Sequence, residues 1–352
     1  MTDSEVTNSE VTADPTVDPD LIDMMDSVFA SYRDTRAPDA PVSRDPELWS
    51  RLEELGLLRL TGSEATGGSG AGWYEAAELM SAAVRHGVRI PLAEHDLLAC
   101  GLLETVGAAI DPAARTVCVL DESGTAVSVP WASTADRVVL VWPDGTGFRV
   151  SDVPADRLRI TAATNMIGEP RDTVVAVDLG TLRGEPVSED VTSALGLKSA
   201  LIRAIQVCAA LDAMVELTVE HTSARIQFGR PLSKFQAIQH AIADIASEAA
   251  LARAATEAAL TAAVASSWSA PDLPFRIAVA RSCAGHAASV AVRNAHQCFG
   301  AIGTTREHRL HEYSRAALAW RAEYGSVRHW DEVVTRAAVG AGASGLWPLI
   351  AT

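Results

Sequence analysis

Apolar positions recur at helical spacing over most of this chain. In residues 46–55, Leu48, Leu52 and Leu55 fall on one face of a helix. Similar spacing before residue 115 predicts helices over 21–32, 46–55, 74–86 and 95–107. After residue 188 it predicts helices over 189–227, 233–268, 271–298, 305–322 and 326–338.

The part between these helices has a different pattern. Residues 116–178 contain short, Val-rich runs separated by Gly, Asp and Pro, which is typical of a small antiparallel β domain. We therefore predict a mainly α protein with a small β domain. Its expected parts are a disordered acidic tail (1–20), an N-terminal helical domain (21–115), the β domain (116–187) and a C-terminal helical bundle (188–352).

Composition and charge narrow the classes of partner. Hydrophobic residues make up 48% of the chain, so a large core is available, and the net charge of −16 argues against nucleic acid and anionic membranes. Residues 1–20 hold six acids and no Lys or Arg, which favours disorder and excludes a secretory signal. The lack of about 20 uninterrupted apolar residues predicts no transmembrane helix. Five cysteines without a CxxC pair indicate reduced thiols in a cytoplasmic protein.

Two short motifs carry the functional signal. Residues 225–240, RIQFGRPLSKFQAIQH, place an Arg, an aromatic–Gly pair, a Pro and Phe-Gln between two predicted helices. Residues 297–305, QCFGAIGTT, form a Gly-rich segment further along. In this order the two segments resemble the flavin-contacting segments of acyl-CoA dehydrogenases, and the α–β–α arrangement resembles that family's architecture. The alternative is a pair of ordinary helix–turn–helix junctions.

The first motif suits an anionic dinucleotide. A pyrophosphate calls for a cation with planar donors, which Arg225 offers. The resemblance implies that Arg225, Phe228 and Gln236 contact an FAD bound mainly by a neighbouring subunit. Each has a structural alternative: Arg225 could pair with a surface acid such as Glu220, and Gln236 has the S-x-x-Q spacing of a capping box with Ser233.

The resemblance assigns the second motif to the ADP half of FAD. It implies that Gln297, Gly300 and Gly303 close over that half, where glycine lets a backbone N–H approach a phosphate. Ala301 stands where the family usually has a second glycine. The alternative is a helix-ending turn with Gly in a left-handed conformation. Thr304 and Glu307 have the spacing of a capping box for the next helix.

The family's reaction is the α,β-dehydrogenation of an acyl-CoA thioester, in which a carboxylate removes the α-proton and the flavin takes the β-hydride. The usual Tyr-Glu-Gly-Thr stretch falls on residues 323–326, Glu-Tyr-Gly-Ser, so Glu323 is the best placed base. It stands one residue early, a rotation of about 100° in a helix. The region of the family's alternative base, residues 196–200, holds no acid. His308, His311 and His329 lack a third ligand at metal spacing, so we expect no metal site.

Three hypotheses follow. The chain is an FAD-dependent acyl-CoA dehydrogenase, or it is a non-catalytic subunit that completes the flavin site of a base-bearing partner, or it is a helical interaction protein. The second fits its similarity to subunits of bacterial heteromeric sterol-side-chain acyl-CoA dehydrogenases. The resemblance implies an acyl-CoA substrate, a homo- or hetero-oligomer with an acyl-CoA dehydrogenase subunit, and an electron-transfer flavoprotein as acceptor.

Overall fold

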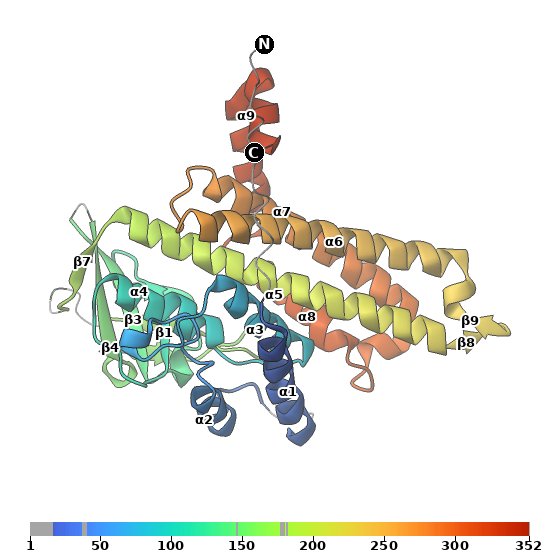
Figure 1. The fold of residues 1–352 in the computed structure, drawn as a ribbon, viewed down its shortest axis with the longest axis horizontal. Helices are drawn as coiled ribbons and strands as arrows, with labels where there is room; N and C mark the ends of the chain where they lie inside the picture. Colours follow the sequence, from blue (N-terminus) through green and yellow to red (C-terminus); the bar gives the residue numbers. More distant parts are fainter. Residues whose placement is uncertain (1–16, 37–40, 146, 177–179, 181, 352) are drawn as a thin grey trace, which may run out of the picture.

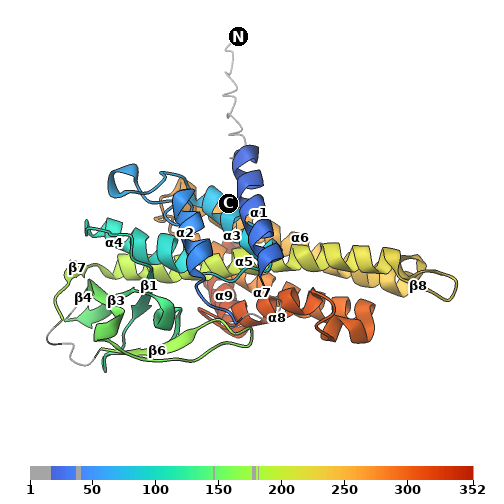
Figure 2. The ribbon, with the colours of Figure 1, turned by 90° about the horizontal axis from the view of Figure 1, so that it is seen from below.

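The structure is a computed structural model that describes residues 17–36, 41–145, 147–176, 180 and 182–351. Most of the acidic tail expected at 1–20 lies outside these residues. A long helical body carries a small β region at one end, and further helices pack across one side of it (Figures 1 and 2). The prediction of a mainly α protein with a small β region and a C-terminal helical bundle is confirmed.

The N-terminal region is helical. Its elements are α1 (Pro19–Thr35), α2 (Pro46–Glu54), η1 (Glu64–Thr66), α3 (Trp73–Arg85), the π-helix η2 (Glu94–Cys100) and α4 (Gly101–Thr105). Aspartates start the first two helices: the Asp45 carboxylate accepts from the backbone N–H groups of Glu47 and Leu48. Leu48 and Leu52 then point into the core, as the helical spacing predicts.

The β region consists of two small sheets. One has the order β1 (Arg115–Val119), β3 (Arg137–Asp144), β4 (Gly147–Pro154), β7 (Glu185–Val187). The other has the order β2 (Thr125–Pro130), β6 (Arg171–Val175), β5 (Arg159–Thr161). The pairs are antiparallel, as expected, except that β1 and β3 run parallel because the chain passes through the second sheet between them.

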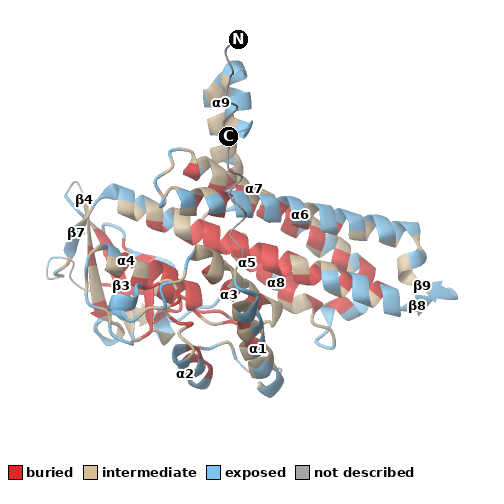
Figure 3. Ribbon diagram, viewed as in Figure 1, coloured by how far each residue is buried: buried red, intermediate tan, exposed pale blue. Residues whose placement is uncertain are grey.

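The C-terminal bundle contains α5 (Glu189–Ala224), α6 (Gln236–Ala265), α7 (Leu273–Phe299), α8 (Leu310–Trp320) and α9 (Val327–Ala351). Helix α5 runs from the β region to the hairpin β8 (Ile226–Gln227)–β9 (Arg230–Pro231) at the opposite end (Figure 1). With 36 residues it spans about 54 Å. Figure 3 shows a continuous buried face along α5, where alanines such as Ala204, Ala210 and Ala213 allow close helix packing.

Both predicted capping boxes are wrong. Helix α6 begins at Gln236 after Phe235, and no side chain caps it. Ser233 lies instead in the short 3-10 turn Leu232–Lys234 that follows the hairpin. Helix α8 begins only at Leu310, beyond the spacing of Thr304 and Glu307. The Gln236 side chain therefore has no capping role.

The last helix is longer than expected. Helix α9 continues past residue 338 to Ala351, with a kink at Gly342 (φ 64°, ψ −178°). By length and composition alone it could cross a membrane, whereas the sequence analysis predicted no transmembrane helix. Its first half carries charged residues and packs Trp330 against the bundle, while Val339 and Trp347 are about three-quarters exposed. In Figure 1 the helix projects away from the body.

Candidate functional site

The first motif lies at the tip of the bundle farthest from the β region (Figure 1). Arg225 ends α5: its N–H donates to the His221 carbonyl (2.9 Å), and its own carbonyl accepts from the Leu232 N–H (2.9 Å). The Arg225 side chain is exposed. No ion pair joins it to Glu220 in the described structure, so the salt-bridge alternative finds no support there.

The hairpin presents an aromatic ring to solvent. Phe228 and Gly229 form its two-residue turn, both with positive φ (53° and 79°). Gly adopts this conformation freely, whereas a bulky residue is strained there, and such strain is concentrated at functional sites. Phe228 is 89% exposed, which is unusual for an aromatic ring and leaves it available for a ligand or partner.

The second motif ends α7 at the same tip. The His221 ring of α5 stacks on the Phe299 ring (4.1 Å between centroids), which brings Arg225 and the Gly-rich segment η7 (Gly300–Thr304) together. Gln297 and Gly300 are exposed, and Gly300 has a left-handed φ of 63°. Gly303 is buried, and a Cβ there would lie 2.8 Å from the Phe299 Cβ, so packing alone requires this glycine.

This end of the molecule favours an anion. Residues 221–243 contain Arg225, Arg230 and Lys234 but no Asp or Glu, although the whole chain carries −16. Arg230 lies over the Phe235 ring at 4.1 Å, whereas the Arg225 side chain projects into solvent. A local excess of cations on an acidic protein attracts a phosphate-bearing ligand.

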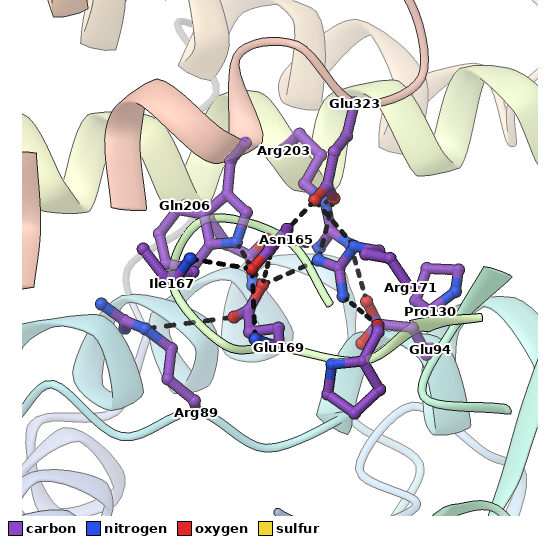
Figure 4. Close-up of polar contacts among 12 residues, drawn as sticks. Arg89, Glu94, Pro130, Asn165, Ile167, Glu169, Arg171, Arg203, Gln206 and Glu323 are labelled. Atoms are coloured by element: carbon purple, nitrogen blue, oxygen red, sulfur yellow. Dashed lines mark hydrogen bonds and ion pairs between the residues drawn. The ribbon is translucent and has the colours of Figure 1, made fainter. Parts of the chain in front are cut away.

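Glu323 lies elsewhere, in the non-helical turn between α8 and α9. The expected 100° rotation therefore does not apply. Its carboxylate accepts from Arg171 Nε (2.7 Å) and Nη2 (2.9 Å), from Arg203 Nε (2.7 Å) and from Asn165 Nδ2 (3.2 Å), as Figure 4 shows.

The contacts of Glu323 belong to a larger buried cluster, which we call the arginine–glutamate network: Arg89, Glu94, Glu169, Arg171, Arg203 and Glu323. Arg203 Nη2 donates to Glu94 (2.8 Å) and Arg171 Nη2 to Glu169 (2.7 Å). Arg89 approaches Glu169 at 4.0 Å. Three arginines balance three glutamates, and all six side chains are at most 17% exposed.

This environment makes Glu323 a weak base. Burial alone would raise the pKa of its carboxyl group, but the Arg203 and Arg171 charges outweigh burial and lower the pKa to about 2. A general base works best with a pKa near the operating pH and a free oxygen aimed at the substrate. A cavity of about 20 Å³ borders Arg89, Glu169, Gln206 and Trp320, which is room for about one water. The role of Glu323 as a base stays a prediction, and its surroundings count against it.

A third arginine fixes the turn that carries Glu323. Buried Arg281, from α7, donates through Nη2 to the carbonyl oxygens of Arg321 (3.0 Å), Glu323 (2.7 Å) and Gly325 (3.3 Å). Burial and the nearby Arg203 lower the pKa of Arg281 to about 10, so it remains charged at neutral pH. The turn is therefore held through its backbone as well as through its carboxylate.

The structure thus separates the predicted site residues into two groups. Arg225, Phe228, Gln236, Gln297, Gly300 and Gly303 lie at the distal tip, whereas Glu323 contacts Arg203 in the middle of α5. Along α5, Arg203 and Arg225 are roughly 33 Å apart. The two groups of predicted site residues therefore lie at well-separated places in one chain.

The sequence analysis missed the partners of Glu323. Asn165, Arg171 and Arg203 lie more than 100 residues before Glu323 and match no motif. One local signal was present: Arg203 interrupts the apolar helical run 200–207, ALIRAIQV, where an arginine needs a buried partner. A cavity of about 590 Å³ between α3, α5 and α6 touches neither group of site residues.

Comparisons with known proteins agree with this architecture. Residues 192–336 match the model of the acyl-CoA dehydrogenase C-terminal domain. Acyl-CoA dehydrogenase IpdE2 of Mycobacterium tuberculosis (strain ATCC 25618 / H37Rv) is 31% identical over 278 residues, covering 78% of this chain and 80% of that protein. The chain belongs to the acyl-CoA dehydrogenase family. Acyl-CoA dehydrogenase FadE27 of the same organism is 26% identical over 321 residues, covering 78% and 83%.

Solved acyl-CoA dehydrogenase structures share the fold. The ChsE4-ChsE5 complex from M. tuberculosis gives a TM-score of 0.79 at 22% identity, covering 92% of this chain and 98% of that one. The Tcur3481-Tcur3483 steroid ACAD gives 0.78 at 20% identity, with the same coverage. Butyryl-CoA dehydrogenase from Megasphaera elsdenii gives 0.74 at 17% identity, covering 92% and 100%. At these identities the likeness shows the fold alone.

Removing the Glu323 charge should destabilise this acyl-CoA dehydrogenase fold. Glu323→Gln leaves Arg171 and Arg203 buried without their shared carboxylate, and breaking such a pair typically costs about 3–5 kcal/mol. The free energy of unfolding in urea at pH 7 should fall by about that amount. Glu332→Gln, an acid exposed on α9, is the control and should leave it unchanged. Equal stability of Glu323→Gln and the native chain would contradict the network's role.

The loss of unfolding free energy in Glu323→Gln should depend on pH. The folded-state pKa of Glu323, about 2, lies below its ordinary value of 4.5, so its ion pairs stabilise the fold fully above pH 4.5. The difference in unfolding free energy between the native chain and Glu323→Gln should therefore shrink as pH falls from 4.5 towards 2. Urea titrations at a series of pH values measure it, and a constant difference over that window would disprove the assignment.

Proposed function

We propose that this chain is the flavin-completing subunit of an FAD-dependent acyl-CoA dehydrogenase, in which a partner chain supplies the base. The assembly would remove hydrogen from Cα and Cβ of an acyl-CoA thioester. One observation carries the proposal: two buried arginines hold Glu323, the acid of the family's catalytic stretch, with a pKa of about 2. The motif residues other than buried Gly303 meanwhile lie exposed at the far tip, where another chain can reach them.

The residues at the tip suit FAD. Arg225 offers two parallel N–H donors to a pyrophosphate. At Gly300 no atom lies within 4 Å of where a Cβ would stand, so a phosphate could approach the backbone there. The exposed amides of Gln236 and Gln297 add further polar contacts, and Phe228 adds an aromatic face. The flavin, when bound, supplies the hydride acceptor.

Similarity to named assemblies supports a mixed oligomer. Two structural neighbours are complexes of differently named chains, ChsE4-ChsE5 and Tcur3481-Tcur3483, and the second is described as a steroid ACAD. We extend this to a heteromer with a second acyl-CoA dehydrogenase subunit, acting in steroid or lipid catabolism. An electron-transfer flavoprotein is the acceptor we propose for the reduced flavin.

A second candidate is that this chain is catalytic itself. The placement of Glu323 in the stretch that matches the family's catalytic segment favours it. Catalysis would then require Glu323 to leave both arginines when substrate binds. The two candidates differ in whether this chain alone can complete the reaction.

Purification of the chain alone and together with an acyl-CoA dehydrogenase subunit encoded beside it separates the candidates. We expect the mixed assembly, but not the chain alone, to hold FAD that is bleached by an acyl-CoA under anaerobic conditions. Butyryl-CoA, octanoyl-CoA and a steroid-derived acyl-CoA are the probes. A flavin-loaded chain that bleaches on its own, and stops doing so in a Glu323→Gln variant that is still folded and still holds FAD, would establish the second candidate instead.

Arg225→Ala should weaken FAD binding without unfolding the chain. A charged hydrogen bond contributes about 1.5–3 kcal/mol, so flavin affinity should fall roughly 10- to 100-fold. The dissociation constant of the assembly for FAD, from the fluorescence of released flavin, measures it. Arg328→Ala, which removes an exposed arginine of α9, is the control. Unchanged affinity for FAD in Arg225→Ala would mean that Arg225 is a surface residue without a role in FAD binding.

A further inference from the structure

A set of stacked rings joins the two flavin motifs at the tip of the bundle. His221 belongs to the last turn of α5, one turn before Arg225. Its ring lies parallel to that of Phe299 at 4.1 Å and an interplanar angle of 15°. The His308 ring, from the connection between α7 and α8, meets Phe299 edge-on at 4.4 Å. Three separate segments therefore meet in one ring cluster.

Each end of this cluster continues directly into a motif residue. On one side, the His221 carbonyl accepts the N–H of Arg225, so a shift of His221 moves the start of the hairpin. On the other side, Phe299 immediately precedes Gly300, and its Cβ touches the backbone of Gly303 so closely that no side chain fits there. Phe299 is 6% exposed and cannot move freely.

We propose that the ring cluster of His221, Phe299 and His308 is the positioning device that sets the spacing between Arg225 and the Gly300–Gly303 segment for one dinucleotide. This inference rests on the function proposed above. Two groups that bind the same dinucleotide must keep a fixed separation. A misplacement of about 1 Å would lower the affinity for the dinucleotide and change its orientation. Between α5 and α7 the stacked rings supply that fixed element.

The rings are uncharged at neutral pH, which suits this role. Burial, followed by the charges of His308 and Arg225, lowers the pKa of His221. Burial also lowers the pKa of His308, where Glu220 acts in the opposite direction and Arg309 and His311 act in the same direction. Neighbouring His296, which meets Ser314 at 2.9 Å, likewise has a pKa lowered by burial and by His311. The cluster therefore adds no positive charge that competes with Arg225 for the phosphate.

The test compares His221→Ala, which removes the stacked ring, with His221→Phe, which keeps it. In the FAD-loaded assembly we expect His221→Ala to raise the dissociation constant of FAD roughly 2- to 10-fold, the worth of one aromatic pair. His221→Phe should restore the native value. His240→Ala, an exposed histidine at the same tip, is the matched control. Far-UV circular dichroism checks that each variant stays helical.

A double variant shows whether His221 acts through Arg225. If it does, His221→Ala combined with Arg225→Ala should bind FAD about as Arg225→Ala does alone, because coupled residues are not additive. Additive losses, or a His221→Phe variant as weak as His221→Ala, would overturn the positioning role. Should His221→Ala unfold, His221→Leu replaces it, since leucine fills the space without a planar ring.

The outcomes also distinguish this inference from the proposed function. If Arg225→Ala weakens FAD binding while His221→Ala does not, only the positioning role is refuted. If Arg225→Ala itself leaves FAD binding unchanged, the assignment of this tip to the flavin fails, and the inference fails with it.

Discussion

A charged side chain that is buried away from water needs a partner of opposite charge. The arginine–glutamate network meets this need where the N-terminal helices, the β region and the helical bundle come together. Arg203 from the bundle pairs with Glu94 from the N-terminal helices, and Arg171 from the β region pairs with Glu169. Glu323 contacts two of these groups at once. The ion pairs therefore join the three regions of the chain at one buried place.

Much of the fold could be predicted from the sequence because its signals are local. Helical periodicity placed the long helices α5, α6 and α7 to within a few residues, and Val-rich runs placed the strands. Predictions that depended on a single local motif did less well. A 3-10 turn follows the hairpin where the capping box of Ser233 and Gln236 was expected, and α9 continues to Ala351 although its predicted end was residue 338.

The candidate site could be predicted only in part, for the same reason. Residues 225–240 and 297–305 are contiguous motifs, so their places at helix ends followed from their neighbours. The arginine–glutamate network joins residues from position 89 to position 323, and no short pattern encodes such distant pairs. Arg203 was the one local sign, since a guanidinium on an apolar helix face requires a buried acid. The stack of His221 on Phe299 was equally invisible, because it depends on how α5 and α7 meet.

The network also bears on how this chain could evolve. Exchanging Glu323 and Tyr324 would restore the residue order of catalytic relatives, but it would strand the guanidinium groups of Arg171 and Arg203 in the interior. Replacing Arg203 first would in turn remove the ion pair of Glu94. We expect each of these changes to lower the stability of the fold. Substitutions in this network are therefore coupled, because the effect of each change on stability depends on which of its charged partners are still present.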